Sequence, residues 1–256
     1  MRVVKIGGRA QGDVRLAERL AAASRVSSRT AGGLCVVHGG GDEVSALQRR
    51  LGLEPKFHGG RRVTSVDDLE IVRMVLSGTT NKRLTAQLVS AGVRAVGVSG
   101  EDAGLFQAHA TDAATMGRVG GRVTVDPSLV RYLVAGGFVP VVSPLARDAD
   151  DPAGAGLNVN GDDAAAALAA ALGADELVLV ADVPGVLEAG ALIASLDEAG
   201  ARALIASGVA AGGMAAKLEA ALAALHGNVP TVRITGLDGI GDVAAGTRIR
   251  LHPTVS

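Results

Sequence analysis

The chain has 256 residues, of which 48% are hydrophobic and 20% are charged, and its formal net charge is -1. This composition excludes a disordered or collagen-like chain, and the near-neutral charge with three Phe, one Tyr and no Trp disfavours nucleic-acid binding. Because no apolar run approaches the roughly 18 residues of a membrane span and no signal-peptide pattern opens the chain, we expect a cytoplasmic protein without a membrane partner.

Short β-branched runs alternate with stretches that have the apolar periodicity of helices. The predicted buried parallel strands are Arg2–Ile6, Leu34–Val37, Ala95–Val98, Phe138–Val142, Leu177–Ala181 and Val229–Ile234. The predicted helices are Asp13–Ser24, Asp42–Leu51, Ser65–Leu76, Thr80–Ala91, Pro127–Ala135, Asp162–Leu172, Leu196–Ala206 and Met214–Leu225. This alternation predicts an α/β fold, a three-layer αβα sandwich with a mostly parallel central sheet, whose active site lies at the carboxyl ends of the strands.

Several helix ends and loops carry local signals. Asp126 and Pro127 form a predicted helix start, and Ser195–Glu198 has the form of a capping box. The segments Leu53–Arg61 and Arg147–Gly156 are rich in glycine, proline and polar residues and lack periodicity, so we predict exposed loops there.

Two of the predicted strands end on glycines. Lys5 lies near the end of the first strand, before Gly7 and Gly8, and His38 is followed by Gly39, Gly40 and Gly41 where a helix begins. Backbone N–H groups at such turns can bind an anion, and the helix N-terminus adds partial positive charge. A tight turn would explain either motif alone, whereas both together with a lysine favour an anion site.

Polar residues also gather at two later helix starts. Asn158, Asn160, Asp162 and Asp163 stand directly before an alanine-rich helix, and capping explains one aspartate but not the whole group. Lys217 follows the glycine pair Gly212–Gly213 near the start of another helix, where a cation opposes the helix dipole and calls for an anion nearby, unless it is an exposed surface lysine. The chain has 25 basic residues and only four are lysines, which suggests that each lysine is retained as a compact point charge.

Several other chemistries lack their motifs. The sequence has no G-x-x-x-x-G-K-[ST] loop, no G-x-G-x-x-G after a strand, no complete nucleophile elbow and no H-E-x-x-H pair, so we predict no protein metal site. The single cysteine, Cys35, cannot form an internal disulfide and lies in a predicted strand, where an inert buried thiol is expected.

In their order, the motifs resemble those of the amino acid kinase family, and the match covers nearly the whole chain. The matching segments are Lys5–Gly8, His38–Gly41, Arg62–Thr64, Asn158–Asp162, Asp182–Val186 and Gly212–Met214 with Lys217. Within this family the chain is most similar to the members that phosphorylate the side-chain carboxylate of N-acetyl-L-glutamate with ATP in arginine biosynthesis. The resemblance implies that fold, with an N-terminal lobe over residues 1–173 for substrate binding and dimerisation, and a C-terminal lobe over 174–256 for ATP.

The resemblance also implies roles for individual residues. The catalytic set it implies is Lys5, Gly8, Asp162 and Lys217, with the lysines neutralising the phosphoryl group and Asp162 organising them. Gly40, Gly41, Arg62 and Asn158 correspond to the substrate-binding set. The nucleotide set is Asp182, Val183, Pro184, Gly185, Val186 and Leu187 with Val209, Ala210 and Ala211. Mg²⁺ is expected on the nucleotide, because no clustered carboxylates suggest a protein cage.

Some points stay open in the sequence. Relatives usually carry leucine at the position of Arg61 and often alanine at that of Gly161; Arg61 either adds a cation near the substrate or points to solvent. A relative acting on N-acetylated or carrier-linked 2-aminoadipate would share most motifs, and Arg49, Arg50, Arg61 and Arg62 would suit an acidic carrier. A non-catalytic effector-binding module of the same fold is a third possibility.

Assembly and regulation form the last expectation. In this family, arginine-inhibited hexamers resemble one another in an extra helix ahead of the first strand. Since the first strand is predicted to begin at Arg2, we expect a C2 homodimer joined through the N-terminal lobe, with weak or absent arginine feedback. A monomer is the simpler alternative.

Overall fold

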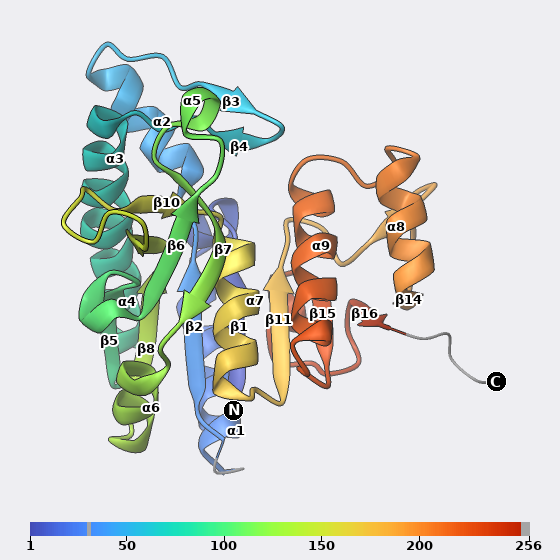
Figure 1. Cartoon of the computed structure of the whole chain (residues 1–256). Coiled ribbons are helices and arrows are strands. Elements are labelled where there is room, and N and C mark those ends of the chain that lie inside the picture. Colours follow the sequence, from blue (N-terminus) through green and yellow to red (C-terminus); the bar gives the residue numbers. More distant parts are fainter. Residues whose placement is uncertain (30–31, 252–256) are drawn as a thin grey trace.

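The computed structural model describes residues 1–29 and 32–251, and its centre is a mixed sheet of eight strands (Figure 1). In spatial order these are β14 (Ser195–Asp197), β16 (Thr247–Arg250), β15 (Val232–Thr235), β11 (Glu176–Val180), β1 (Arg2–Ile6), β2 (Leu34–His38), β8 (Val139–Ser143) and β5 (Ala95–Ser99). The strands from β15 to β5 are parallel to one another, and β16 and β14 run in the opposite direction. The predicted three-layer α/β fold is confirmed.

Helices cover both faces of this sheet because its central strands are apolar on both sides. One face packs against α6 (Ser128–Ala135), α7 (Gly161–Leu172) and α9 (Gly213–His226), with α8 (Glu198–Ala206) outside α9. The other face packs against α1 (Leu16–Arg29), α4 (Asn81–Ser90) and the short helix η4 (Leu237–Ile240). Cys35 is fully buried in the first of these two cores, and burial raises its pKa to about 12, as expected for an inert thiol.

A second group of elements lies beyond the carboxyl ends of β1 and β2. It contains η1 (Arg9–Gly12), α2 (Gly41–Arg50), α3 (Val66–Arg73), the π-helical segment η2 (Met74–Thr80), η3 (Asp102–Gly104), α5 (Ala113–Met116) and the hairpin of β3 (Phe57–His58) and β4 (Arg61–Arg62). A small closed barrel is formed by β6 (Phe106–Ala110), β7 (Val119–Val125), β9 (Leu145–Asp148) and β10 (Leu157–Val159). A further hairpin, of β12 (Leu187–Glu188) and β13 (Ala191–Leu192), follows β11.

Several sequence-based boundaries were wrong. The first helix begins at Leu16 and not at Asp13, because the Asp13 carboxylate accepts the backbone N–H of Arg15 and ends a separate turn there. The helix predicted to start at Leu196 starts at Glu198, since Ser195–Asp197 pairs with β16 as a strand and Asp197 caps the helix through the N–H of Gly200. The strand predicted from Val229 begins at Val232.

The two predicted loops contain strands. The segment 53–61 includes β3 and the start of β4, and the segment 147–156 includes the end of β9, because short strands of polar residues lack the apolar alternation that reveals a strand. The helices predicted over 65–76 and 80–91 form one run, in which η2 replaces the break that Ser77 and Gly78 suggested.

The predicted lobe boundary at residue 173 falls in the turn between α7 and β11, and both sides of it contribute strands to the same sheet. Residues 252–256 of the predicted C-terminal lobe lie outside the described part. Across residues 1–29 and 32–251, no helix has both the length and the apolar character needed to cross a membrane.

Candidate active site

The two glycine turns lie side by side at the carboxyl ends of β1 and β2. These strands are adjacent and parallel, with Ile6 in register with His38, so the chain leaves both at the same edge of the sheet. A Cβ atom added to Gly8 would lie 3.7 Å from the backbone nitrogen of Gly41, which places the two turns in contact. The predicted pair of anion-binding turns is therefore a single patch of backbone.

Beside this patch, Asp162 lies between the two lysines. The Lys5 Nζ is 2.9 Å from Asp162 Oδ1, and the Lys217 Nζ is 3.3 Å from Asp162 Oδ2. Their exposed fractions are only 6%, 4% and 9% for Lys5, Asp162 and Lys217. Three elements thus meet here: the end of β1, the first turn of α7 and the first turns of α9.

Burial and charge act in opposite directions on these groups. Burial disfavours the Asp162 carboxylate, but the positive charges of Lys5 and Lys217 outweigh it and lower its pKa. Burial also lowers the pKa of Lys217, and the neighbouring Lys5 lowers it further, against the attraction of Asp162. The anion that the position of Lys217 called for is thus Asp162 itself.

Asp162 is free to meet the lysines because another residue caps its helix. The Asn160 side chain accepts the backbone N–H of Asp162 at 2.7 Å and that of Asp163 at 3.4 Å. The idea that Asp162 itself caps the helix was therefore wrong, and α7 begins one residue earlier than predicted, at Gly161.

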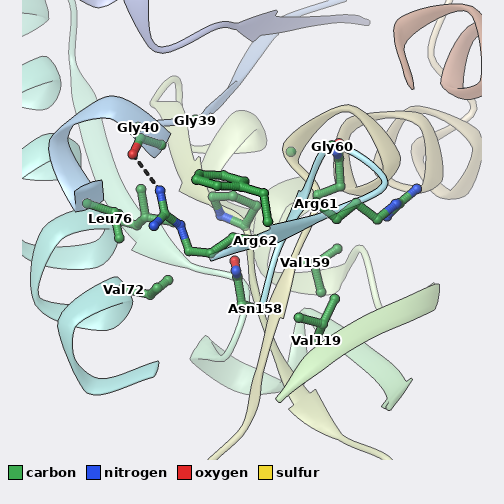
Figure 2. Close-up of a pocket in the computed structure, with 16 residues that line it drawn as sticks. Gly39, Gly40, Gly60, Arg61, Arg62, Val72, Leu76, Val119, Asn158 and Val159 are labelled. Atoms are coloured by element: carbon green, nitrogen blue, oxygen red, sulfur yellow. Dashed lines mark hydrogen bonds between the residues drawn. The ribbon is translucent and has the colours of Figure 1, made fainter. Parts of the chain in front are cut away.

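A pocket of about 200 Å³, drawn in Figure 2, is lined in part by Gly161, the residue directly before Asp162. It brings together all four residues of the predicted substrate-binding set, which are Gly40, Gly41, Arg62 and Asn158. Apolar side chains complete the wall: Val44, Phe57, Val72, Leu76, Val119 and Val159. Gly40 has a φ of +153°, and a Cβ there would come within 2.7 Å of Leu76, so the close approach of η2 requires glycine.

Arg62 is a buried cation whose two terminal nitrogens donate hydrogen bonds within the protein. Its guanidinium donates to the Gln48 side chain, to the Gly41 carbonyl at 2.7 Å and to Ser45 Oγ at 2.7 Å, and it stacks 4.8 Å from the Phe57 ring centre. Burial lowers its pKa. Figure 2 shows it pointing toward Gly40 and Leu76, and its neighbours fix this orientation.

Arg61 points the other way in Figure 2, and it lines the same pocket as Arg62. Its guanidinium forms an ion pair of 2.8 Å with Asp163, in the first turn of α7 and next to Asp162. At the tip of the same hairpin, a Cβ on Gly60 would lie 4.0 Å from Gly212, directly before α9. The β3–β4 hairpin therefore contacts both helices that bring catalytic candidates to the site.

A larger pocket, of about 730 Å³, is lined mostly by residues of the C-terminal half of the chain. Three residues of the predicted nucleotide set line it: Asp182, Val183 and Pro184. Val186 is buried and does not line the pocket; its N–H donates to Thr247 Oγ1 at 2.8 Å. Gly185 and Leu187 follow the same segment without lining the pocket. Val209, Ala210 and Ala211 lie between α8 and α9 and do not line it either.

Sequence reasoning missed the opposite wall of this pocket. Arg9 and the segment from Thr235 to Gly246, which includes Asp238 and Asp242, line it. A signal was available, because Gly236, Gly239, Gly241 and Gly246 follow the predicted sixth strand, at the same sheet edge as the two glycine turns already singled out. Among the described residues, no group of three or more His, Cys, Asp and Glu side chains could hold a metal ion.

Comparison with known proteins agrees with this architecture. Residues 1–236 match the amino acid kinase family. The acetylglutamate kinase of Chloroflexus aurantiacus is 44% identical over 248 residues, which cover 96% of this chain and 95% of the relative. The crystal structure of smu.665 from Streptococcus mutans UA159 superposes with a TM-score of 0.87 at 28% identity, over 98% of each chain. N-acetylglutamate synthase from Neisseria gonorrhoeae, complexed with coenzyme A and N-acetyl-glutamate, superposes with a TM-score of 0.81 at 25% identity over 100% of this chain and 60% of that one. The chain belongs to the amino acid kinase family.

The balance of buried charge can be tested with Asp162→Asn. Without the anion, the folded-state pKa of Lys217 falls further below its ordinary value of about 10.4, so protonated Lys217 opposes folding at every pH below that value. We expect the free energy of unfolding at pH 7 to fall by about 3 kcal/mol, the cost of breaking a buried pair, and the loss to shrink as the pH rises toward 10. Urea denaturation at pH 7 and pH 9.5 measures both.

Glu219→Gln is the matched control for this charge change, because Glu219 is an exposed carboxylate on the same helix as Lys217. Its effect should stay within about 0.5 kcal/mol at both pH values. A loss in Asp162→Asn that does not depend on pH would contradict the argument.

Proposed function

We propose that this chain is an acetylglutamate kinase: it transfers the γ-phosphoryl group of ATP to the side-chain carboxylate of N-acetyl-L-glutamate, forming N-acetyl-L-glutamyl 5-phosphate in arginine biosynthesis. The observation that carries this is the buried group of Lys5, Asp162 and Lys217, which stands beside a small pocket and joins the two lobes. Relatives at 44% identity over nearly the whole chain bear that name, which supports the substrate.

Phosphoryl transfer to a carboxylate needs positioning and charge stabilisation more than it needs proton transfer. The nucleophile is ionised at neutral pH, so no general base is required, in agreement with a site built from lysines and backbone N–H groups. Lys5 and Lys217 would neutralise the negative charge that spreads over the equatorial oxygens in the transition state. Asp162 would hold the two ammonium groups in place, and the N–H of Gly8 would face the phosphates.

The pocket of about 200 Å³ would hold the amino acid substrate. Asn158 lines it, and its Nδ2 donates to Thr64 Oγ1 at 3.1 Å, which leaves the amide oxygen to face the substrate. Arg62 would attract the α-carboxylate, and Gly40 and Gly41 would supply N–H donors at the start of α2. The hairpin that carries Arg61 and Arg62 would close over the bound substrate as a lid.

The same contacts weigh against a carrier-linked substrate. Of the four arginines that would suit an acidic carrier, Arg62 is buried and Arg61 is paired with Asp163, so only Arg49 and Arg50 are exposed and free of these contacts. A free, small N-acylated amino acid fits the site better. A purely regulatory binding module would have no use for two buried lysines and their aspartate.

ATP would bind in the larger pocket, against Asp182, Val183 and Pro184 of the predicted nucleotide set. Arg9 pairs with Asp182 at 3.2 Å across this pocket. Mg²⁺ would be held mainly by the phosphates of the nucleotide, since the described carboxylates do not gather into a cage. A C2 homodimer through the N-terminal lobe, whose outermost strand β5 ends the sheet, stays a prediction.

The test of the function is an acyl-phosphate trapping assay with hydroxylamine and ATP. N-acetyl-L-glutamate should give product, and glutamate, aspartate, N-acetyl-2-aminoadipate and a carrier-linked substrate should give much less. Faster turnover of an aminoadipate substrate would reassign the specificity, and no turnover of any of these would refute the enzyme.

The two lysines should be essential for the chemical step. Lys5→Ala and Lys217→Ala should each lower kcat about 10²-fold or more, while circular dichroism shows a folded protein. Lys217→Arg should also be impaired, because a planar guanidinium cannot take the place of a compact ammonium between Asp162 and the phosphoryl group. Near-normal turnover by either alanine variant would remove that lysine from the catalytic set.

Arg62 should act on substrate capture. Arg62→Ala should raise the KM for N-acetyl-L-glutamate by about tenfold or more and leave the KM for ATP within about twofold, since a charged hydrogen bond contributes roughly 1.5 to 3 kcal/mol. Arg50→Ala, an exposed arginine on α2, is the control and should change neither constant. Equal increases in both KM values would indicate a general folding or closure defect.

A further inference from the structure

The carbonyl oxygen of Gly39 receives two side-chain hydrogen bonds from inside the protein. His38 Nδ1 lies 2.8 Å from it, and Gln11 Nε2 donates to it at 2.8 Å. His38 is fully buried and Gln11 is 5% exposed. These two residues come from the ends of β2 and η1, so both glycine turns contribute to holding one peptide group.

The hydrogen-bond partners define the state of the imidazole. A carbonyl oxygen only accepts, so His38 Nδ1 carries the proton, and Nε2 accepts from Asn81 Nδ2 at 3.1 Å. Asn81 is fully buried; its Nδ2 also donates to the Val141 carbonyl at 2.8 Å, and its Oδ1 accepts from Lys82 Nζ at 3.1 Å, which fixes the amide orientation. Burial lowers the pKa of His38 to about 4, in agreement with a neutral ring.

The Gln11 side chain binds the same oxygen, and only one orientation of its amide allows this bond. Its Oε1 is buried and has no hydrogen-bond partner among the described residues, so the amide is held by the bond from Nε2 to the Gly39 carbonyl. Turning the amide over would place two acceptor oxygens against each other. A buried amide oxygen without a partner lowers the stability of the fold. The presence of Gln11 at this position therefore indicates that its bond to the Gly39 carbonyl has a role besides stability.

Fixing the Gly39 carbonyl also fixes the N–H of Gly40. In a trans peptide the C=O and the following N–H point in opposite directions, and the described chain has no cis peptide bond. Since the Gly39 carbonyl is held toward His38 and Gln11 in the interior, the Gly40 N–H points away from them, on the side where Gly39, Gly40 and Gly41 line the pocket. The Gly39 N–H donates to the Ile6 carbonyl at 2.9 Å, so the preceding peptide is held as well.

We propose that His38 and Gln11 are positioning residues that aim the Gly40 N–H at the group being transferred, with Asn81 holding the imidazole in its Nδ1-protonated form. The inference rests on the proposed kinase function for its kinetic part. It assigns a role to a histidine that neither accepts nor donates a proton in the reaction.

Two substitutions at position 38 separate this role from simple packing. In His38→Asn the amide nitrogen is attached to Cγ, as Nδ1 is, and can donate to Gly39; in His38→Gln the amide reaches the position of Nε2 and keeps the contact to Asn81 instead. We expect kcat to fall at least tenfold in His38→Gln and to stay within about threefold in His38→Asn, with both KM values within about twofold. Gln11→Met, which keeps the side-chain length, should lower kcat about fivefold.

Matched controls are His226→Asn and Gln87→Met, because both residues are exposed and distant from the pocket in the fold. Both should retain wild-type kcat. Equal or better activity of His38→Gln relative to His38→Asn, or an unchanged kcat in Gln11→Met, would overturn the proposal. Should either variant at position 38 fail to fold, as judged by circular dichroism, the Gln11→Met result decides.

A second readout needs no substrate. Long-range ¹H–¹⁵N NMR spectra of the wild-type protein should show one histidine that stays neutral and Nδ1-protonated from pH 5.5 to 8, and its signals should be absent from a folded variant at position 38. An Nε2-protonated or titrating His38 would overturn the proposal. If N-acetyl-L-glutamate is not turned over by the wild type, the proposed function fails while this spectrum still tests the tautomer.

Discussion

The site depends on three buried charges that do not sum to zero. Lys5 and Lys217 share one carboxylate, Asp162, so the group carries an excess positive charge where water is largely excluded. Such an excess is costly unless a further anion arrives, and a phosphoryl group with its spread negative charge is an anion of the right kind. In the proposed reaction, the free-energy cost of burying the extra cation would be offset by the negative charge that develops during phosphoryl transfer.

The parallel sheet provides the geometry for this charge cluster. Because β1 and β2 are parallel neighbours, their glycine turns meet, and α7 and α9 pack on the same face with their N-termini directed to the same edge. Figure 1 shows both helices standing beside β1 and β11. A backbone patch of N–H donors from the turns after β1 and β2 then lies beside the ammonium groups of Lys5 and Lys217.

The sequence predicted the elements that have a regular apolar pattern. It did not predict features that depend on contacts between residues far apart in the chain. The six parallel strands follow from their continuous apolar runs, and Lys5, Asp162 and Lys217 stand out as charges beside glycines or apolar helices. The barrel of β6, β7, β9 and β10 was not predicted, because β9 and β10 have only four and three residues and β6 and β7 are interrupted by glycine, alanine and polar residues. The pairing of Arg61 with Asp163, 102 residues away, has no local signal in the sequence.

That long-range pair connects the β3–β4 hairpin to α7. Arg62 holds the inner side of the β3–β4 hairpin to α2 through Gln48 and Ser45, whereas Arg61 holds its outer side to α7 through Asp163. Adjacent residues of one strand point to opposite sides, so one short strand can bind two helices at once. Asp163 follows Asp162 directly, so this ion pair ties the hairpin to the first turn of α7, where Asp162 meets both lysines. Under the proposed function, the lid over the amino acid would therefore be connected to the charges beside the phosphoryl group.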